Sequence, residues 1–110
     1  MAGFIKGEIV VVPFPFSDLS SSKRRPALIL ADLSGDDIVL CQITSQSSAD
    51  PNAIQLSTTD FQVGELPKLS YIRPIRIFTA DKNIIIRRVG TVKSAYFEKV
   101  IDKLVAVLKS

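Results

Sequence analysis

Three cations and a proline, Lys23-Arg24-Arg25-Pro26, follow a loop rich in hydroxyls and precede an apolar run. Because a proline disfavours helical backbone in the residue before it, we expect Arg25 to be the first extended residue of a strand, with its guanidinium at the rim of a sheet. A planar cation with five donors suits a phosphate or a pentacovalent phosphorane better than a lysine does. These residues therefore predict an anion site. The alternative from the residues alone is a surface arginine paired with Asp18 or Glu8.

Hydroxyls also follow a second apolar run, in Thr44-Ser45-Gln46. We expect the runs at residues 27–31 and 38–44 to pair as a hairpin, so that the end of the second lies beside the start of the first. Thr44 would then donate a hydrogen bond to the anion that Arg25 binds. The alternative is a threonine that makes a local turn with its own backbone, which is common at strand ends.

The composition excludes several kinds of active site. The chain of 110 residues contains no histidine and one cysteine, Cys41. Catalysis by Ser-His-Asp or Cys-His groups, histidine or cysteine metal sites and an internal disulfide are therefore excluded, and we expect Cys41 to be a small buried thiol. An enzyme with this composition uses Arg, Lys, Asp, Glu or hydroxyl groups, and we expect no metal and no other cofactor. The net charge of +3 is compatible with a polyanionic partner.

The hydropathy pattern predicts one mainly-β domain that occupies residues 1–110. Branched apolar runs and turn residues predict strands at 7–13, 27–31, 38–44 and 69–79, a short strand at 53–56, and a last strand from residue 84 to about 90. Residues 57–67 are expected to form an irregular connection. Pro74 interrupts the longest strand, which indicates an edge or a bulge at that point.

A helical period begins near the C-terminus. Apolar residues recur with helical spacing at Phe97, Val100, Ile101, Leu104, Val105 and Leu108. This spacing predicts a helix over residues 93–109 that packs with this face on its own barrel. Short strands followed by one amphipathic helix are typical of a small half-open β-barrel, SH3-like or CcdB-like, with a C-terminal helix. No signal peptide and no apolar run of about 20 residues is present, so we expect a cytoplasmic protein without a membrane span.

Several segments together resemble the PemK/MazF family of toxins from bacterial type II toxin–antitoxin modules. The segments are Gly7-Glu8-Ile9-Val10, Pro13-Phe14-Pro15-Phe16-Ser17-Asp18, residues 23–30, Ile43-Thr44-Ser45, residues 69–74 and Arg87-Arg88-Val89-Gly90. The resemblance covers nearly the whole chain. It implies a barrel of five to seven strands with a C-terminal helix, and a dimeric, metal-independent ribonuclease that cuts single-stranded RNA at short motifs.

The resemblance also implies roles for single residues. Arg25 and Thr44 match the catalytic residues of the family. The residues expected to bind RNA or phosphate are Ser20, Ser21, Ser22, Lys23, Arg24, Ser45, Gln46 and Arg73. The products would be a 2′,3′-cyclic phosphate and a free 5′-OH. The implied partners are single-stranded RNA, a second copy of the chain as a homodimer, and a cognate antitoxin peptide that is acidic and partly disordered, without DNA binding by the toxin alone.

Two departures from the family pattern leave the general base unassigned. The Kid branch has an Arg-x-Asp element on a later strand, whereas this chain has Arg73-Pro74-Ile75. Many relatives have Gly-x-Glu in the loop where this chain has serines. Glu8 and Asp18 are candidates for the base by position alone. The alternative function is a non-catalytic barrel of the same fold that acts by binding, either as a gyrase poison like CcdB or as an RNA-binding module.

Overall fold

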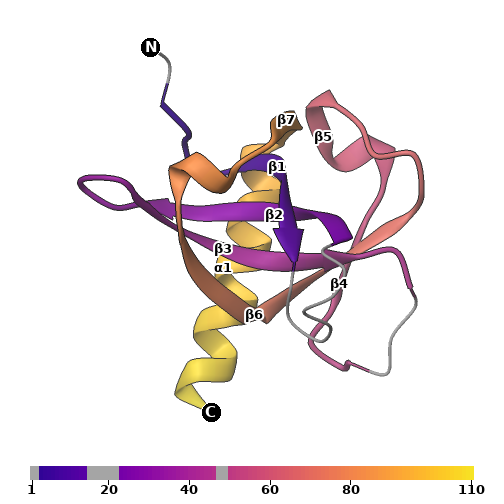
Figure 1. Ribbon diagram of the computed structural model, residues 1–110. Coiled ribbons are helices and arrows are strands. Elements are labelled where there is room, and N and C mark those ends of the chain that lie inside the picture. Colours follow the sequence, from indigo (N-terminus) through magenta and orange to yellow (C-terminus); the bar gives the residue numbers. More distant parts are fainter. Residues whose placement is uncertain (1–2, 15–22, 47–49) are drawn as a thin grey trace.

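The computed structural model describes residues 3–14, 23–46 and 50–110, and in it a curled antiparallel sheet is backed by one helix (Figure 1). The strands are β1 (Glu8–Phe14), β2 (Lys23–Asp32), β3 (Asp37–Thr44), β4 (Ile54–Leu56), β5 (Phe61–Gly64), β6 (Ser70–Asp81) and β7 (Arg87–Val92). They form one seven-stranded sheet in the order β4-β6-β3-β2-β1-β7-β5, and helix α1 (Ser94–Lys109) follows. The predicted mainly-β half-open barrel with a C-terminal helix is confirmed.

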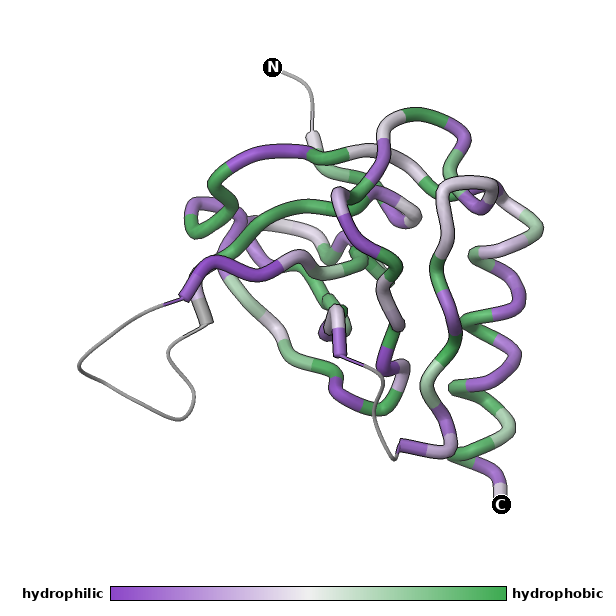
Figure 2. The backbone as a smooth tube through the Cα atoms, turned by 90° about the vertical axis from the view of Figure 1, so that its right-hand side faces the viewer, coloured by the Kyte–Doolittle hydropathy of each residue, from purple (hydrophilic) through white to green (hydrophobic). Residues whose placement is uncertain are grey.

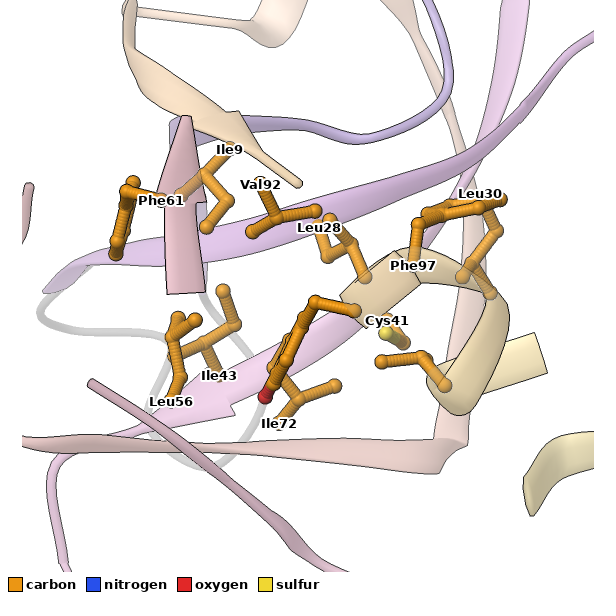
Figure 3. Close-up of a cluster of buried hydrophobic side chains, with 12 residues drawn as sticks. Ile9, Leu28, Leu30, Cys41, Ile43, Leu56, Phe61, Ile72, Val92 and Phe97 are labelled. Atoms are coloured by element: carbon orange, nitrogen blue, oxygen red, sulfur yellow. The ribbon is translucent and has the colours of Figure 1, made fainter. Parts of the chain in front are cut away.

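Both faces of the central strands are buried, which explains their nearly continuous apolar sequences. Residues on one face pack beneath α1, where Ile9, Leu28, Val92 and Phe97 belong to the same cluster (Figure 3). The other face forms a smaller cluster, made of Val10, Val12, Ala27, Ile29, Ile38 and Leu40. Side chains alternate between these clusters along β1, β2 and β3, so a shift of register by one residue would exchange the two cores.

Helix α1 alternates apolar and polar segments along its length, as Figure 2 shows. Phe97 and Val100 are buried against the sheet, as predicted. The expectation was wrong for the end of the face, because Val105 and Leu108 are 41% and 71% exposed. The last turns of α1 extend past the sheet (Figure 1), and Leu104 is the last apolar residue of this face that packs against the cluster beneath the helix. Tyr96, which the apolar pattern omitted, is buried and donates its hydroxyl to the Gln55 carbonyl at 2.7 Å.

The predicted irregularity at Pro74 is a large bulge. Against β3, the pairing of β6 passes from Cys41↔Ile77 directly to Gln42↔Arg73. Three residues of β6 are therefore left out of the ladder, and the first of them is Pro74, which has no N–H to contribute to it.

Several expected boundaries need correction. β2 begins at Lys23, ahead of Arg25, because β1 continues to Phe14 and pairs with it there. The connection at 57–67 contains the strand β5, which pairs with β7, and a 3₁₀ turn over Thr58–Asp60.

The last strand begins at Arg87, later than expected, because residues Lys82–Ile84 form a 3₁₀ turn in which the Asp81 side chain accepts the Asn83 N–H at 2.8 Å. No helix in the described part of the chain is long and apolar enough to cross a membrane.

Candidate functional site

The strands β2 and β3 separate at the end of the sheet where the predicted site residues lie. Their ladder ends at Ala27↔Gln42. Beyond that pair, β2 continues beside β1 as far as Lys23↔Phe14, and β3 continues beside β6 as far as Thr44↔Tyr71. The two strand ends therefore diverge and form a fork, which we call the β2–β3 fork.

Pro26 explains why the ladder stops there. Val11, the partner of Pro26 in β1, turns its carbonyl toward the β7 side, where it accepts the N–H of Ile86 at 2.8 Å. Because backbone groups alternate between the two neighbours of a strand, the nitrogen of Pro26 faces β3. A proline nitrogen donates no hydrogen bond, so the β2–β3 ladder ends at Ala27↔Gln42.

Arg25 and Thr44 flank the β2–β3 fork. Ala27 and Gln42 lie opposite each other, and Arg25 and Thr44 are each two residues further along their strands. Side chains two residues apart share a face of a strand, so Arg25 and Thr44 project from the same face on adjacent strands. Both are half-buried. The Thr44 hydroxyl oxygen accepts the Gln46 N–H at 3.2 Å, an interaction that uses a lone pair of the oxygen and not the hydroxyl hydrogen.

A cleft of about 350 Å³ opens beside the fork, and Arg25 lines it whereas Thr44 does not. The lining residues Val11, Pro26 and Ile43 alternate with Val12, Arg25 and Thr44 along their strands, so they belong to the opposite face of the sheet. Four cations line the cleft: Arg24, Arg25, Lys68 and Arg87. Glu65 is the single carboxylate among the lining residues. The local excess of three positive charges equals the net charge of the whole chain, +3. Within the described ranges none of the four cations forms an ion pair, so their charge remains available to a ligand.

The floor of the cleft is apolar. It includes the buried side chains Val11 and Ile43 and the half-buried Pro26, Leu66 and Val89. These residues come from β1, β2, β3, β7 and the connection between β5 and β6. The cleft therefore combines an apolar floor with a cationic rim, and it is assembled from segments far apart in the sequence.

The other expected RNA-binding residues are placed as follows. Lys23 and Arg24 are exposed at the start of β2, Ser45 lines the cleft and Gln46 is exposed beside it. Ser20, Ser21 and Ser22 lie outside the described residues, as does Asp18. Lys68, Arg87 and Glu65 were not predicted as site residues. Their signal is weak in the sequence, since single charged residues at a strand start or in a loop are common.

Arg73 is held by a carboxylate from another part of the chain. Its Nε donates to Oδ2 of Asp50 at 3.0 Å, and the Asp50 side chain is only 5% exposed. Asp50 also accepts the Asn52 N–H at 2.9 Å. The hydrogen bond from Asn52 and then the Arg73 guanidinium lower the pKa of Asp50, against the opposing effect of burial. Asp50 is thus ionised at neutral pH, and its negative charge compensates the positive charge of Arg73.

Glu8, one of the two candidates for the general base, has a structural role. Oε1 accepts the Ile5 N–H at 2.7 Å, and Oε2 accepts from Nε of Arg88 at 2.7 Å. Arg88 lies in turn over the ring of Phe4, 4.3 Å from its centroid. Glu8 also precedes Val12, the partner of Arg25, by four residues, or roughly 13 Å along the strand. Glu8 therefore fastens the N-terminal segment to β7 and is remote from the fork.

Cys41 is fully buried in the cluster beneath α1, as expected. Burial raises the pKa of its thiol to about 12, so the thiolate is not formed at neutral pH. Cys41 is therefore no nucleophile.

The family model for PemK-like, MazF-like toxins of type II toxin–antitoxin systems matches residues 5–108 of the chain. The chain belongs to this family. No curated protein sequence matches it significantly. The family assignment confirms the resemblance inferred from the motifs between Gly7 and Gly90.

Solved structures share the MazF-like fold over nearly the whole chain. MazF from Deinococcus radiodurans superimposes with a TM-score of 0.76 at 19% identity, and covers 100% of both chains. A mycobacterial endoribonuclease in complex with its cognate antitoxin gives a TM-score of 0.74 at 18% identity, over 99% of this chain and 96% of that one. Toxin MazF-mt6 of Mycobacterium tuberculosis gives 0.73 at 13% identity, over 93% and 96%. At these identities the likeness shows the fold.

Proposed function

We propose that this MazF-like protein is an endoribonuclease that cleaves single-stranded RNA without a metal ion. The observation that supports this most directly is the β2–β3 fork, where Arg25 and Thr44 project from one face of adjacent strands and Arg25 also lines a cleft with a cationic rim. Family membership and the likeness to structures described as endoribonucleases agree with it. The bacterial cytoplasm is where such an enzyme would meet its RNA.

The proposed reaction is an internal transesterification. The ribose 2′-oxygen attacks the adjacent phosphorus as its proton passes to solvent water, and the bond from phosphorus to the 5′-oxygen breaks. The 5′-oxygen takes up a proton, so the products are a 2′,3′-cyclic phosphate and a 5′-OH. Arg25 stabilises the negative charge that grows on the phosphorane, and Thr44 donates one neutral hydrogen bond to a phosphate oxygen. Arg25 acts here as a charge and not as the base.

Cleavage of a long single-stranded RNA in the presence of EDTA tests the proposal, with the chemical nature of the new ends mapped. We expect cyclic phosphate and 5′-OH ends. Intact RNA at high protein concentration would refute the nuclease function, and RNA bound without cleavage would favour the binding module instead. Cleavage that disappears on addition of EDTA would refute the metal-free mechanism.

Variants at the fork test the two roles. Arg25→Ala should lower the cleavage rate by about 10²-fold or more, because it removes a charge that acts on the transition state. Thr44→Val should cost less, since one neutral hydrogen bond is lost. The matched control is Arg76→Ala, which removes an exposed arginine that does not line the cleft. A wild-type rate for Arg25→Ala would refute its assignment.

We also propose that the protein is a homodimer and is neutralised by an acidic antitoxin peptide that covers the cationic rim. Charge complementarity between such a peptide and the four lining cations supports this. Sedimentation at micromolar concentration tests the dimer, and a 12.1 kDa species would contradict it. The peptide should inhibit RNA cleavage in proportion to its occupancy, and the inhibition should weaken as salt rises.

A further inference from the structure

We propose that Tyr71 is a further catalytic residue, whose phenol donates the proton that the 5′-oxygen takes up as it leaves. This inference rests on the nuclease function proposed above, and it adds the source of that proton. It follows from the strand register around the β2–β3 fork, which places Tyr71 beside Thr44.

Tyr71 lies in one row with the residues of the fork. Its partner on β3 is Thr44, and directly opposed residues of antiparallel strands share a face of the sheet. Arg25 projects from that same face on the other neighbour of β3, which is β2. Adjacent strands lie about 4.8 Å apart, so the short Thr44 side chain stands between the two long side chains of Arg25 and Tyr71. The three groups therefore surround a space that fits one phosphate.

The backbone of Tyr71 is held from both sides. On β4 its partner is Gln55, whose carbonyl accepts the Tyr96 hydroxyl at 2.7 Å. The neighbours of Tyr71 along β6, Ser70 and Ile72, are both buried. Tyr71 itself is half-buried, so its position is restrained while part of its surface stays open to a ligand.

The functional groups on this face single out the phenol as the acid. Gln42 and Arg73 form the next row of the same face, two residues along their strands from Thr44 and Tyr71. A phenol gives up a proton more readily than an aliphatic hydroxyl or a carboxamide, and a guanidinium keeps its proton throughout. Among the described residues of these two rows, Tyr71 is therefore the best proton donor to a departing alkoxide.

The carboxyl groups of Glu8, Asp50 and Glu65 do not supply this acid. The Asp50 side chain is 5% exposed and binds Arg73 at 3.0 Å. Glu8 binds Arg88 at 2.7 Å and is remote from the fork. Glu65 lines the cleft, whose floor belongs to the opposite face of the sheet. The phenol of Tyr71 therefore has no competitor among these three groups.

The role of Tyr71 completes the proton transfers of the reaction. The 2′-oxygen forms its bond to phosphorus while the bond from phosphorus to the 5′-oxygen breaks, and Oη of Tyr71 transfers its proton to the departing 5′-oxygen. The phenolate then regains a proton from solvent water, which has received the proton of the 2′-OH. Because Thr44 stands between Arg25 and Tyr71, the group that stabilises charge and the group that donates the proton act on different oxygens.

A substrate with a 5′-bridging sulfur tests this role. In a short RNA that spans a mapped cleavage site, sulfur replaces the 5′-oxygen of the scissile phosphate, and a thiolate leaves without needing a proton. Tyr71→Phe keeps the ring, and in single-turnover kinetics it should slow cleavage of the oxygen substrate by about 10²-fold. It should cleave the sulfur substrate at nearly the wild-type rate. Arg25→Ala should slow both substrates, because negative charge grows on the phosphorane in either case.

Tyr96→Phe is the matched control. It removes the other phenol of the chain, from a buried site beneath α1, and should leave both rates unchanged below its unfolding transition. Circular dichroism and urea midpoints would show that each variant is folded.

The outcomes separate this inference from the nuclease function. A wild-type rate for Tyr71→Phe on the oxygen substrate would overturn the inference. An equal loss on both substrates would overturn it too, because Tyr71 would then position the RNA or support the fold without donating the proton. Wild-type protein that cleaves neither substrate would refute the nuclease function itself, and the inference with it.

Discussion

The sequence led us to expect that Arg73 binds RNA, but in the structure Arg73 forms an ion pair with Asp50. We predict that this pair stabilises the fold. Removing the negative charge by Asp50→Asn leaves a guanidinium without its partner. A charged hydrogen bond contributes about 1.5–3 kcal/mol, and breaking a fully buried pair costs about 3–5 kcal/mol. The Arg73 side chain is 22% exposed and can regain some hydration, so the loss should lie in the lower range, about 1.5–3 kcal/mol. For a domain of this size that lowers Tm by roughly 6–12 °C.

A double-mutant cycle isolates the pair. Urea unfolding of the wild type, Asp50→Asn, Arg73→Met and the double variant would give the coupling energy between the two side chains. We expect at least about 1 kcal/mol of coupling, since the two atoms lie 3.0 Å apart and the carboxylate is buried. Additive losses, within about 0.5 kcal/mol, would refute the structural role of the pair.

The pH dependence gives an independent check on Asp50. Its pKa is below the usual value in the folded protein, so its contribution to stability is present above the pKa of the unfolded chain and is lost as pH falls through the folded pKa. The stability gap between the wild type and Asp50→Asn should thus be constant from pH 5 to 7 and shrink below about pH 4. A gap that stays constant down to pH 2.5 would contradict this.

RNA binding of the same variants decides between the two roles of Arg73. If Asp50 compensates the positive charge of Arg73, Arg73→Met should weaken RNA binding no more than Arg76→Met does. A larger loss for Arg73→Met, measured below the unfolding transition, would restore the assignment made from the sequence.

Three further predictions concern the framework. Gly90→Ala should destabilise the protein by several kcal/mol and lower its urea midpoint, because a Cβ at Gly90 would lie 2.3 Å from the backbone oxygen of Val63. Tyr96→Phe should cost about 0.5–1.5 kcal/mol in the same assay, since it removes the 2.7 Å hydrogen bond to Gln55 and leaves the packing of the ring unchanged, and no loss would show that water replaces the hydroxyl. Cys41 should react with a thiol reagent only as fast as the protein unfolds, so rapid labelling of the native protein would contradict its burial and raised pKa.

The sequence alone determined those features that depend on neighbouring residues. A β-branched apolar run predicts a strand wherever it occurs, and a proline restricts the residue before it and removes one donor, so the central strands and the irregularity at Pro74 were predictable. The helical period from Phe97 to Leu104 needs no partner to be recognised. The arginine and threonine of the fork were found through motifs within single segments.

The tertiary structure decided everything that depends on pairing between distant segments. The strand Phe61–Gly64 is too short to be recognised, and it exists because Gly64 and Gly90 allow two backbones to approach closely. The run Ile84–Ile86 looks like a strand, but Ile84 ends a 3₁₀ turn capped by Asp81, and β7 begins only at Arg87. The curl of the sheet determines whether the Arg73 side chain faces RNA or Asp50. It also determines whether Glu65 and Lys68 reach the cleft beside Arg25. No local pattern encodes these contacts, because each joins residues that only the folded chain brings together.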